Sequence, residues 1–253
     1  MSNSFLLRNP EPLDNSEVKH NSILPIPLMM VICGKTGSGK TRLLLKMMLT
    51  DNFLDYNNVI VFTPTKEQKD YLLLQYGFEY KLLKSDMIAI TGILHKYRDE
   101  QIEEICKFYS QNKEGSAEQI QISFYDQIHN IPPPTTLNKY KKNLIIFDDC
   151  VELKNQTIIE SYFTKGRHAN CSCIYLAQNF YGIPKGNIRT QLSAIILFKL
   201  GDSDKKFSYE HVSSFMDRRD YYQLLNIIWK KQFSYVYINK QTEEITDNIF
   251  SEL

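Results

Sequence analysis

Eight residues near the start of the chain have the types and the spacing that bind a row of phosphate groups. They read Gly34-Lys35-Thr36-Gly37-Ser38-Gly39-Lys40-Thr41 and match the pattern G-x-x-x-x-G-K-[ST]. The glycines allow backbone conformations in which successive N–H groups converge on phosphate oxygens. Lys40 would reach the β- and γ-phosphates, and the Thr41 hydroxyl would ligate Mg²⁺. The segment therefore predicts a Walker A loop that binds a nucleoside triphosphate.

The flanks of this loop supply the strand and the helix that the pattern requires. An apolar run ends at Cys33, and strong helix formers run from Lys40 to Met48. The positive end of that helix would point at the same phosphates. We expect contacts to the nucleotide from Gly34, Lys35, Thr36, Gly37, Ser38, Gly39, Lys40, Thr41 and Arg42.

A second motif with chemistry lies at Asn143–Cys150, which reads NLIIFDDC. Four apolar residues followed by an acid are typical of a Walker B strand, buried in a parallel sheet and ending at its phosphate side. Asp148 would bind Mg²⁺, directly or through water. Asp149 would orient and deprotonate the water that attacks the γ-phosphate.

Gln178 follows a third apolar strand, Cys171–Ala177. A polar amide at such a strand tip lies near the γ-phosphate in the P-loop ATPases that this layout resembles. The alternative is an ordinary loop glutamine.

Strand and helix patterns alternate along the rest of the chain, which predicts an α/β fold with a mostly parallel central sheet flanked by helices. Strands are also expected at 57–65 and 194–200, and 233–239 is expected as an edge strand that closes the chain. Helices are expected at 66–75, 96–112, 156–164, 204–216 and 217–230. Residues 86–94 are expected to form a short strand and turn.

Two regions are predicted: a flexible N-terminal arm at 1–22 and one RecA-like P-loop domain at 23–253. The arm lacks periodicity and contains Pro10 and Pro12. The domain is long enough to bury a sizeable core, about 70–75% of its unfolded surface.

Composition limits the remaining options. The net charge is +1, so contact with nucleic acid depends on local patches such as Lys139–Lys142, which we interpret first as a solvated loop. The five cysteines are scattered and predict no disulfide framework. Cys171 and Cys173 follow His168, but core packing is a better explanation than a metal site. No signal peptide or membrane-spanning segment is indicated, which predicts a soluble, intracellular protein.

Four segments together resemble the genome-packaging ATPases of large double-stranded DNA viruses, virophages and polinton-like elements, which belong to the FtsK–HerA superfamily. They are GKTGSGKT, LIIFDD, FTKGRHANCSCIYLAQ and GNIRTQLSAIILFK, and the likeness runs from about residue 24 to residue 200. The layout resembles the additional-strand, catalytic-acid division of P-loop ATPases, in which another strand lies between the Walker A and Walker B strands. About a hundred residues separate Lys40 from Asp148, which is enough for an intervening strand-helix unit, and the strand at 57–65 supplies one. Most such enzymes have Glu as the second acid, whereas this chain has Asp149.

The resemblance implies a pentameric or hexameric ring that threads double-stranded DNA, without reading its sequence, through a capsid vertex. It implies ATP and Mg²⁺ as ligands and Gln178 as a sensor of the γ-phosphate. It also implies an arginine supplied by the next subunit, with Arg167 as the first candidate and Arg189 as the second. The expected location is the host cytoplasm or viral factory, with association with the virion as a further option.

Three other functions compete with a packaging motor. A guanine-nucleotide switch would need N-K-x-D, and Asn239-Lys240-Gln241-Thr242 differs at the last position. A small-molecule kinase would need an arginine-rich lid, which is not evident. A helicase or translocase of the same superfamily, not tied to packaging, stays open.

Overall fold

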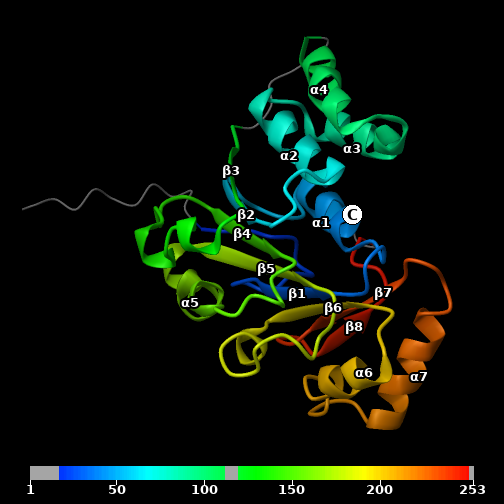
Figure 1. Cartoon of the computed structure of the whole chain (residues 1–253). Helices are drawn as coiled ribbons and strands as arrows, with labels where there is room; N and C mark the ends of the chain where they lie inside the picture. Colours follow the sequence, from blue (N-terminus) through cyan, green and yellow to red (C-terminus); the bar gives the residue numbers. More distant parts are fainter. Residues whose placement is uncertain (1–16, 112–118, 251–253) are drawn as a thin grey trace, which may run out of the picture.

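A computed structural model describes residues 17–111 and 119–250, which form one central sheet flanked by helices (Figure 1). The sheet order is β3-β2-β4-β5-β1-β6-β7-β8. The first six strands in this order are parallel, and β7 and β8 are antiparallel to their neighbours. The strand bounds are β1 Met29–Cys33, β2 Asn58–Phe62, β3 Gln121–Tyr125, β4 Asn143–Asp148, β5 Cys171–Ala177, β6 Ala194–Phe198, β7 Tyr235–Asn239 and β8 Glu244–Thr246. The predicted α/β class with a mostly parallel sheet is confirmed.

Helices cover both faces of the sheet. The bounds are α1 Lys40–Leu49, α2 Lys69–Glu79, α3 Lys84–Ile93, α4 Ile102–Gln111, α5 Thr157–Lys165, α6 Asp202–Tyr209 and α7 Arg218–Ile228. We call residues 69–111, which hold α2, α3 and α4 between β2 and β3, the helical insert. It forms a separate group above α1 in Figure 1.

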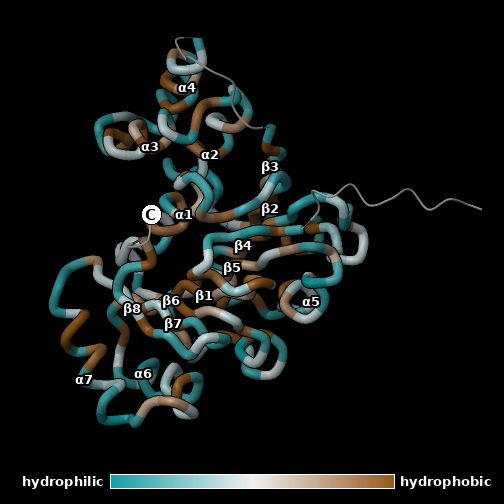
Figure 2. Tube along the Cα trace, turned by 180° about the vertical axis from the view of Figure 1, so that it is seen from behind, coloured by the Kyte–Doolittle hydropathy of each residue, from teal (hydrophilic) through white to brown (hydrophobic). Residues whose placement is uncertain are grey.

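The alternation of side chains along each strand divides the core in two. Met30 and Ile32 of β1 pack on one face with α1 and the helical insert. Val31 and Cys33 point to the other face, where α5 and α7 cover them. Because the parallel strands are buried on both faces, they are apolar almost throughout, as Figure 2 shows along the middle of the sheet.

The expectation of a short strand and turn at 86–94 is wrong, because these residues form α3. Met87 and Ile90 are fully buried three residues apart, whereas Ile88 is exposed. This spacing belongs to one face of a helix, and the short apolar run concealed it.

Sequence order also gives the wrong neighbours in two places. One strand does lie between the Walker A strand β1 and the Walker B strand β4, as the resemblance implies, but it is β5. The strand that fills the interval in the sequence, β2, pairs with the far side of β4. At the other end, β7 is not the edge strand, because β8 pairs with it through Ile238 and Ile245. Residues beyond the expected edge strand, Glu244–Thr246, therefore supply the last strand of the sheet.

The segment at 19–21 contacts the domain, although we expected an arm as far as residue 22. The backbone N–H of Lys19 donates to Asp55, and a ring nitrogen of His20 lies 2.8 Å from the Ser172 hydroxyl. The main chain of Asn21 donates to the carbonyl of Phe53. The rest of the predicted arm, residues 1–16, lies outside the described residues.

All five cysteines are buried and free, as expected for core thiols. Cys173 lies within 3.5 Å of the Tyr162 carbonyl, and burial raises the pKa of its thiol. Within 17–111 and 119–250 no cluster of three or more His, Cys, Asp or Glu side chains suits a metal ion. None of the helices in these same ranges is both long and apolar enough to cross a membrane.

Candidate nucleotide site

The Walker A loop joins β1 to α1, and its glycines meet different requirements. Gly37 and Gly39 have φ of +73° and +102°, in the left-handed region that side chains disfavour. Gly34 has an ordinary φ, but a Cβ there would lie 2.6 Å from Cβ of Phe198 and 2.6 Å from Oγ of Ser38. Two glycines therefore serve backbone conformation, and the first serves close packing.

The start of α1 has the features of an anion site. Gly39 is the N-cap and provides no side chain to bond the free N–H groups, and the first turn contains no acid. The hydroxyl of Ser38 is buried and has no hydrogen-bond partner among the described residues. These donors and the positive end of the helix fit a phosphate chain.

Lys40 lies folded over the loop. Its Nζ donates to the carbonyl of Gly34 at 2.7 Å and to that of Lys35 at 3.2 Å. Burial lowers the pKa of the ammonium group, while the negative charges of Asp148 and Asp149 oppose this effect. The ammonium group of Lys40 is thus bonded to the loop and lies close enough to Asp148 and Asp149 to be stabilised by their negative charges.

Asp148 ends β4 and is buried. Its Oδ2 accepts a 2.6 Å hydrogen bond from the hydroxyl of Tyr71 on α2. Burial raises the pKa of the carboxyl group, and the Tyr71 bond and the charge of Lys40 lower it. A carboxylate and a hydroxyl are oxygen ligands of the kind Mg²⁺ prefers, and the predicted role of Asp148 and of Thr41, in the first turn of α1, as its ligands stays a prediction.

Asp149 and Gln178 are in direct contact. Asp148 pairs with Leu176 in the sheet, so the residues that follow the two strands emerge beside each other. Nε2 of Gln178 donates to Oδ1 of Asp149 at 2.8 Å. The amide therefore lies against the second acid, and its role as a sensor of the γ-phosphate stays a prediction.

Asp149 also has a left-handed backbone, with φ of +55°. Asp and Asn tolerate this conformation better than most residues do. The sharp turn after β4 leaves its side chain exposed at the sheet edge, whereas the side chain of Asp148 is buried.

The two candidate arginines do not join this site within the chain. Arg167 lies just before β5, toward the edge of the sheet opposite the Walker A loop, whereas Arg189 lies in the connection from β5 to β6. Arg167 is exposed, and its Nη2 donates to Gln191 at 2.9 Å. Arg189 is only 6% exposed and packs its guanidinium against Phe207, at 5.5 Å from the ring centre. Their predicted role, which is to reach the nucleotide of a neighbouring subunit, stays a prediction.

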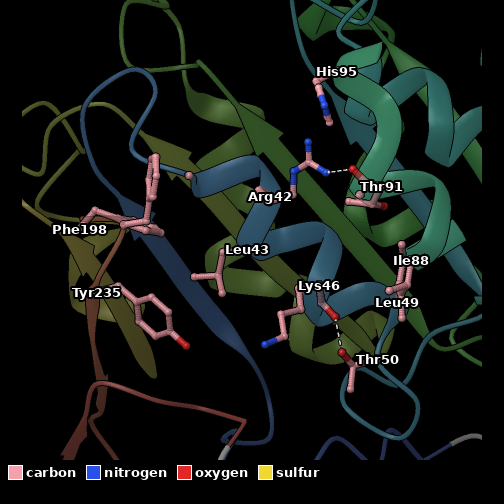
Figure 3. A pocket seen from close by; sticks show the side chains of 13 residues that line it. Arg42, Leu43, Lys46, Leu49, Thr50, Ile88, Thr91, His95, Phe198 and Tyr235 are labelled. Atoms are coloured by element: carbon pink, nitrogen blue, oxygen red, sulfur yellow. Dashed lines mark hydrogen bonds between the residues drawn. The ribbon is translucent and has the colours of Figure 1, made fainter. Parts of the chain in front are cut away.

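Two contacts join the nucleotide site to the helical insert, and neither could be predicted from the Walker motifs. The guanidinium of Arg42 points to the helical insert, where it donates to the Thr91 carbonyl and lies 3.5 Å from a carboxylate oxygen of Asp70 (Figure 3). Tyr71, the partner of Asp148, lies 77 residues before it and was not predicted. Tyr71 belongs to the buried, otherwise apolar face of α2, and its hydroxyl is the one feature in the sequence that sets it apart from the other residues of that face.

Comparison with known proteins places the chain among viral proteins. The family model described as Poxvirus A32 protein matches residues 15–252. The "DNA packaging protein OPG160" of vaccinia virus (strain Copenhagen) is 24% identical over 248 residues, which cover 93% of this chain and 75% of that protein. The variola virus protein of the same name is 25% identical over 243 residues, covering 91% and 73%.

Solved structures with a similar arrangement are more distant. The genome packaging NTPase B204 from Sulfolobus turreted icosahedral virus 2, in complex with ATP-gammaS, aligns with a TM-score of 0.47 at 12% identity and covers 87% of this chain and 96% of that one. VirB4 of Thermoanaerobacter pseudethanolicus aligns with a TM-score of 0.43 at 10% identity, covering 85% and 87%. The viral resemblance read from the motifs is confirmed by the family model. Since that model spans nearly the whole chain, this protein belongs to the Poxvirus A32 protein family.

Proposed function

We propose that this chain is an ATP-hydrolysing motor that moves double-stranded viral DNA into a capsid. The observation that carries the hydrolytic part is the contact between Asp149 and Gln178, at the sheet edge where the Walker A loop and Asp148 also lie. The relatives named as DNA packaging proteins support the packaging part.

ATP would lie with its phosphates on the backbone N–H groups between Gly34 and Thr41. Nζ of Lys40 would exchange its two loop carbonyls for β- and γ-phosphate oxygens, which are stronger, charged acceptors. Mg²⁺ held by Thr41 and Asp148 would neutralise charge on the same phosphates.

Hydrolysis would use the second acid and its amide partner. Asp149 accepts a proton from a water molecule while the water oxygen bonds to the γ-phosphorus atom. The bond from that phosphorus to the β–γ bridging oxygen breaks, which yields ADP and phosphate. Gln178 holds the carboxylate in place and lies where the loss of the γ-phosphate would change its contacts.

The motor would act as a pentameric or hexameric ring. Arg167, the exposed arginine, would reach the neighbouring subunit's nucleotide and stabilise transition-state charge, with Arg189 as the second candidate. The ring would grip duplex DNA through its phosphates and dock on a capsid vertex. We place this work in the host cytoplasm or viral factory, with association with the virion.

ATP turnover measured with and without duplex DNA tests the proposal. We expect DNA to stimulate turnover and Lys40→Ala to abolish it, whereas Lys206→Ala on the exposed side of α6 leaves it unchanged. Turnover that ignores DNA would contradict a translocating motor. Nucleotide binding without turnover under all conditions would favour a switch.

A further inference from the structure

A cavity of about 790 Å³ runs along α1, from its N-cap Gly39 to its C-cap Thr50 (Figure 3). One wall is α1, the second is α3 of the helical insert, and the third is formed by the end of β6 and the start of β7. The lining is mainly apolar, and it includes three aromatic residues, Phe198, Phe233 and Tyr235. None of the nucleotide contacts predicted from the sequence, apart from Gly39 and Arg42, belongs to it.

The cavity is continuous with the Walker A loop, because Gly39 belongs to both. A Cβ on Gly39 would lie 3.6 Å from Cε1 of Phe198 and 3.7 Å from Cδ1 of Phe233. The two rings therefore border the point where the loop becomes α1. A nucleotide whose phosphates bind the loop has its sugar and base immediately beyond that point.

Phe233 has an unusual conformation. Its side chain is 61% exposed, and its backbone φ is +61°, in the left-handed region. A non-glycine residue is strained in this region, and such residues concentrate at binding sites. An exposed aromatic ring held beside a phosphate loop is suited to stacking on a flat ligand.

We propose that this cavity receives the base of the bound nucleoside triphosphate, stacked on Phe233 and Phe198. The inference rests on the proposed function, since it requires the phosphates to bind the Walker A loop. The size suits the ligand, because small-molecule sites run from about 300 to 1,000 Å³ and are mostly apolar with few polar groups. The helical insert, through Ile88 and Thr91 of α3, closes the side opposite the aromatic residues.

The polar side chains of the walls are largely engaged with the protein itself. The hydroxyls of Thr50 and Thr91 donate to the carbonyls of Lys46 and Met87 at 2.6 and 2.7 Å. Arg42 donates to the Thr91 carbonyl, and Nζ of Lys46 lies 3.9 Å from the ring centre of Phe250. Apart from His95, the polar side chains named in the lining are thus engaged, so the base is held mainly by its faces, and ATP and GTP bind within about tenfold of each other.

Binding of ATP and of inorganic tripolyphosphate, each with Mg²⁺, tests the proposal by calorimetry on the full chain. Stacking of one base on an aromatic side chain is worth about 1–3 kcal/mol, so Phe233→Ala weakens ATP binding about tenfold or more. Binding of tripolyphosphate, which has no base, stays the same. Phe233→Trp restores ATP binding. Phe108→Ala, a matched control at an exposed phenylalanine of α4 that does not line the cavity, changes neither.

Unchanged ATP binding in Phe233→Ala overturns the proposal, and so does an equal loss for ATP and tripolyphosphate, which would place the effect at the phosphate loop. A preference for ATP over GTP above a hundredfold would overturn recognition by stacking alone. If the wild-type chain binds neither ATP nor tripolyphosphate, the proposed function itself fails.

Discussion

The hydroxyl of Tyr71 donates a 2.6 Å hydrogen bond to the carboxylate of Asp148, and this bond links the helical insert to the acid predicted to hold Mg²⁺. Tyr71 and Asp148 are both buried, so water does not replace the donor when it is removed. The bond also lowers the pKa of the Asp148 carboxyl group, against the effect of burial. The insert thus takes part in keeping the acid ionised.

Tyr71→Phe should therefore raise the Mg²⁺ concentration that turnover requires and shift the acid limb of the pH–rate profile. Without the donor, the pKa of Asp148 rises further, so activity is lost at a higher pH than in the wild type, and half-saturation requires several-fold more Mg²⁺. The free energy of unfolding should fall by about 1–3 kcal/mol at neutral pH, since a buried acceptor loses its partner.

Tyr80→Phe is the matched control for this change. Tyr80 also donates to a carboxylate, Glu103 at 2.7 Å, but on the surface of the helical insert. The substitution Tyr80→Phe should leave unchanged both the Mg²⁺ concentration that turnover requires and the pH profile of turnover. If Tyr71→Phe behaves like Tyr80→Phe, the buried bond does not tune Asp148.

Asp149→Asn should keep ATP binding and lose hydrolysis by at least a hundredfold, because an amide cannot accept the proton from water. The left-handed backbone at this position suits Asn as well as Asp, so the turn after β4 should keep its shape. Nucleotide affinity by calorimetry and turnover by phosphate release measure the two effects separately. Unchanged turnover would remove Asp149 from catalysis.

Mixing two inactive variants tests the arginine across the interface. Arg167→Ala subunits mixed with Asp149→Asn subunits should regain part of the turnover, since some interfaces pair an intact acid with an intact arginine. Each variant alone stays inactive. Restored activity in the corresponding Arg189→Ala mixture, with none for Arg167→Ala, would make Arg189 the interface residue.

Stability should fall as the pH drops from about 6.5 toward 4, because two half-buried histidines are held in neutral form. Burial lowers the pKa of His20 and of His211 to about 4, in each case with a nearby lysine adding to the effect. Around His20, Asp55 opposes the shift; around His211, Lys240, Arg189 and Lys185 lower the pKa and Glu210 opposes them.

In this window the unfolded chain binds more protons than the folded one, so the free energy of unfolding decreases as pH falls. Each histidine should contribute on the order of 1–2 kcal/mol between pH 7 and pH 5. Urea denaturation at both pH values measures the slope, and His211→Phe should reduce it. His129→Gln, a change at an exposed histidine, should leave the slope as it is.

The nucleotide motifs were predictable because their function is encoded in neighbouring residues. The loop at 34–41 must combine glycines, Lys40 and Thr41 within one turn, and Asp148 and Asp149 follow an unmistakable buried strand. The role expected of Gln178 came from the resemblance, and its contact with Asp149 is explained by the sheet, because neighbouring parallel strands end at one edge.

Contacts between distant segments were not predictable in this way. Strand order in space differs from order in the chain, which is why β5 and not β2 separates β1 from β4. Tyr71 reaches Asp148 only once the helical insert has packed, and the aromatic residues of the cavity come from β6, β7 and the loop before β7. No local pattern specifies such meetings.

The burial of all five cysteines has a practical consequence for watching this protein at work. Thiol-reactive dyes attack exposed thiolates, and burial raises the pKa of Cys106 to about 12 and leaves every native thiol out of reach while the chain is folded. A single cysteine introduced on the surface would then be the sole point of dye attachment. A fluorophore attached there could report the position of one subunit during each cycle, and the native cysteines would not first have to be replaced.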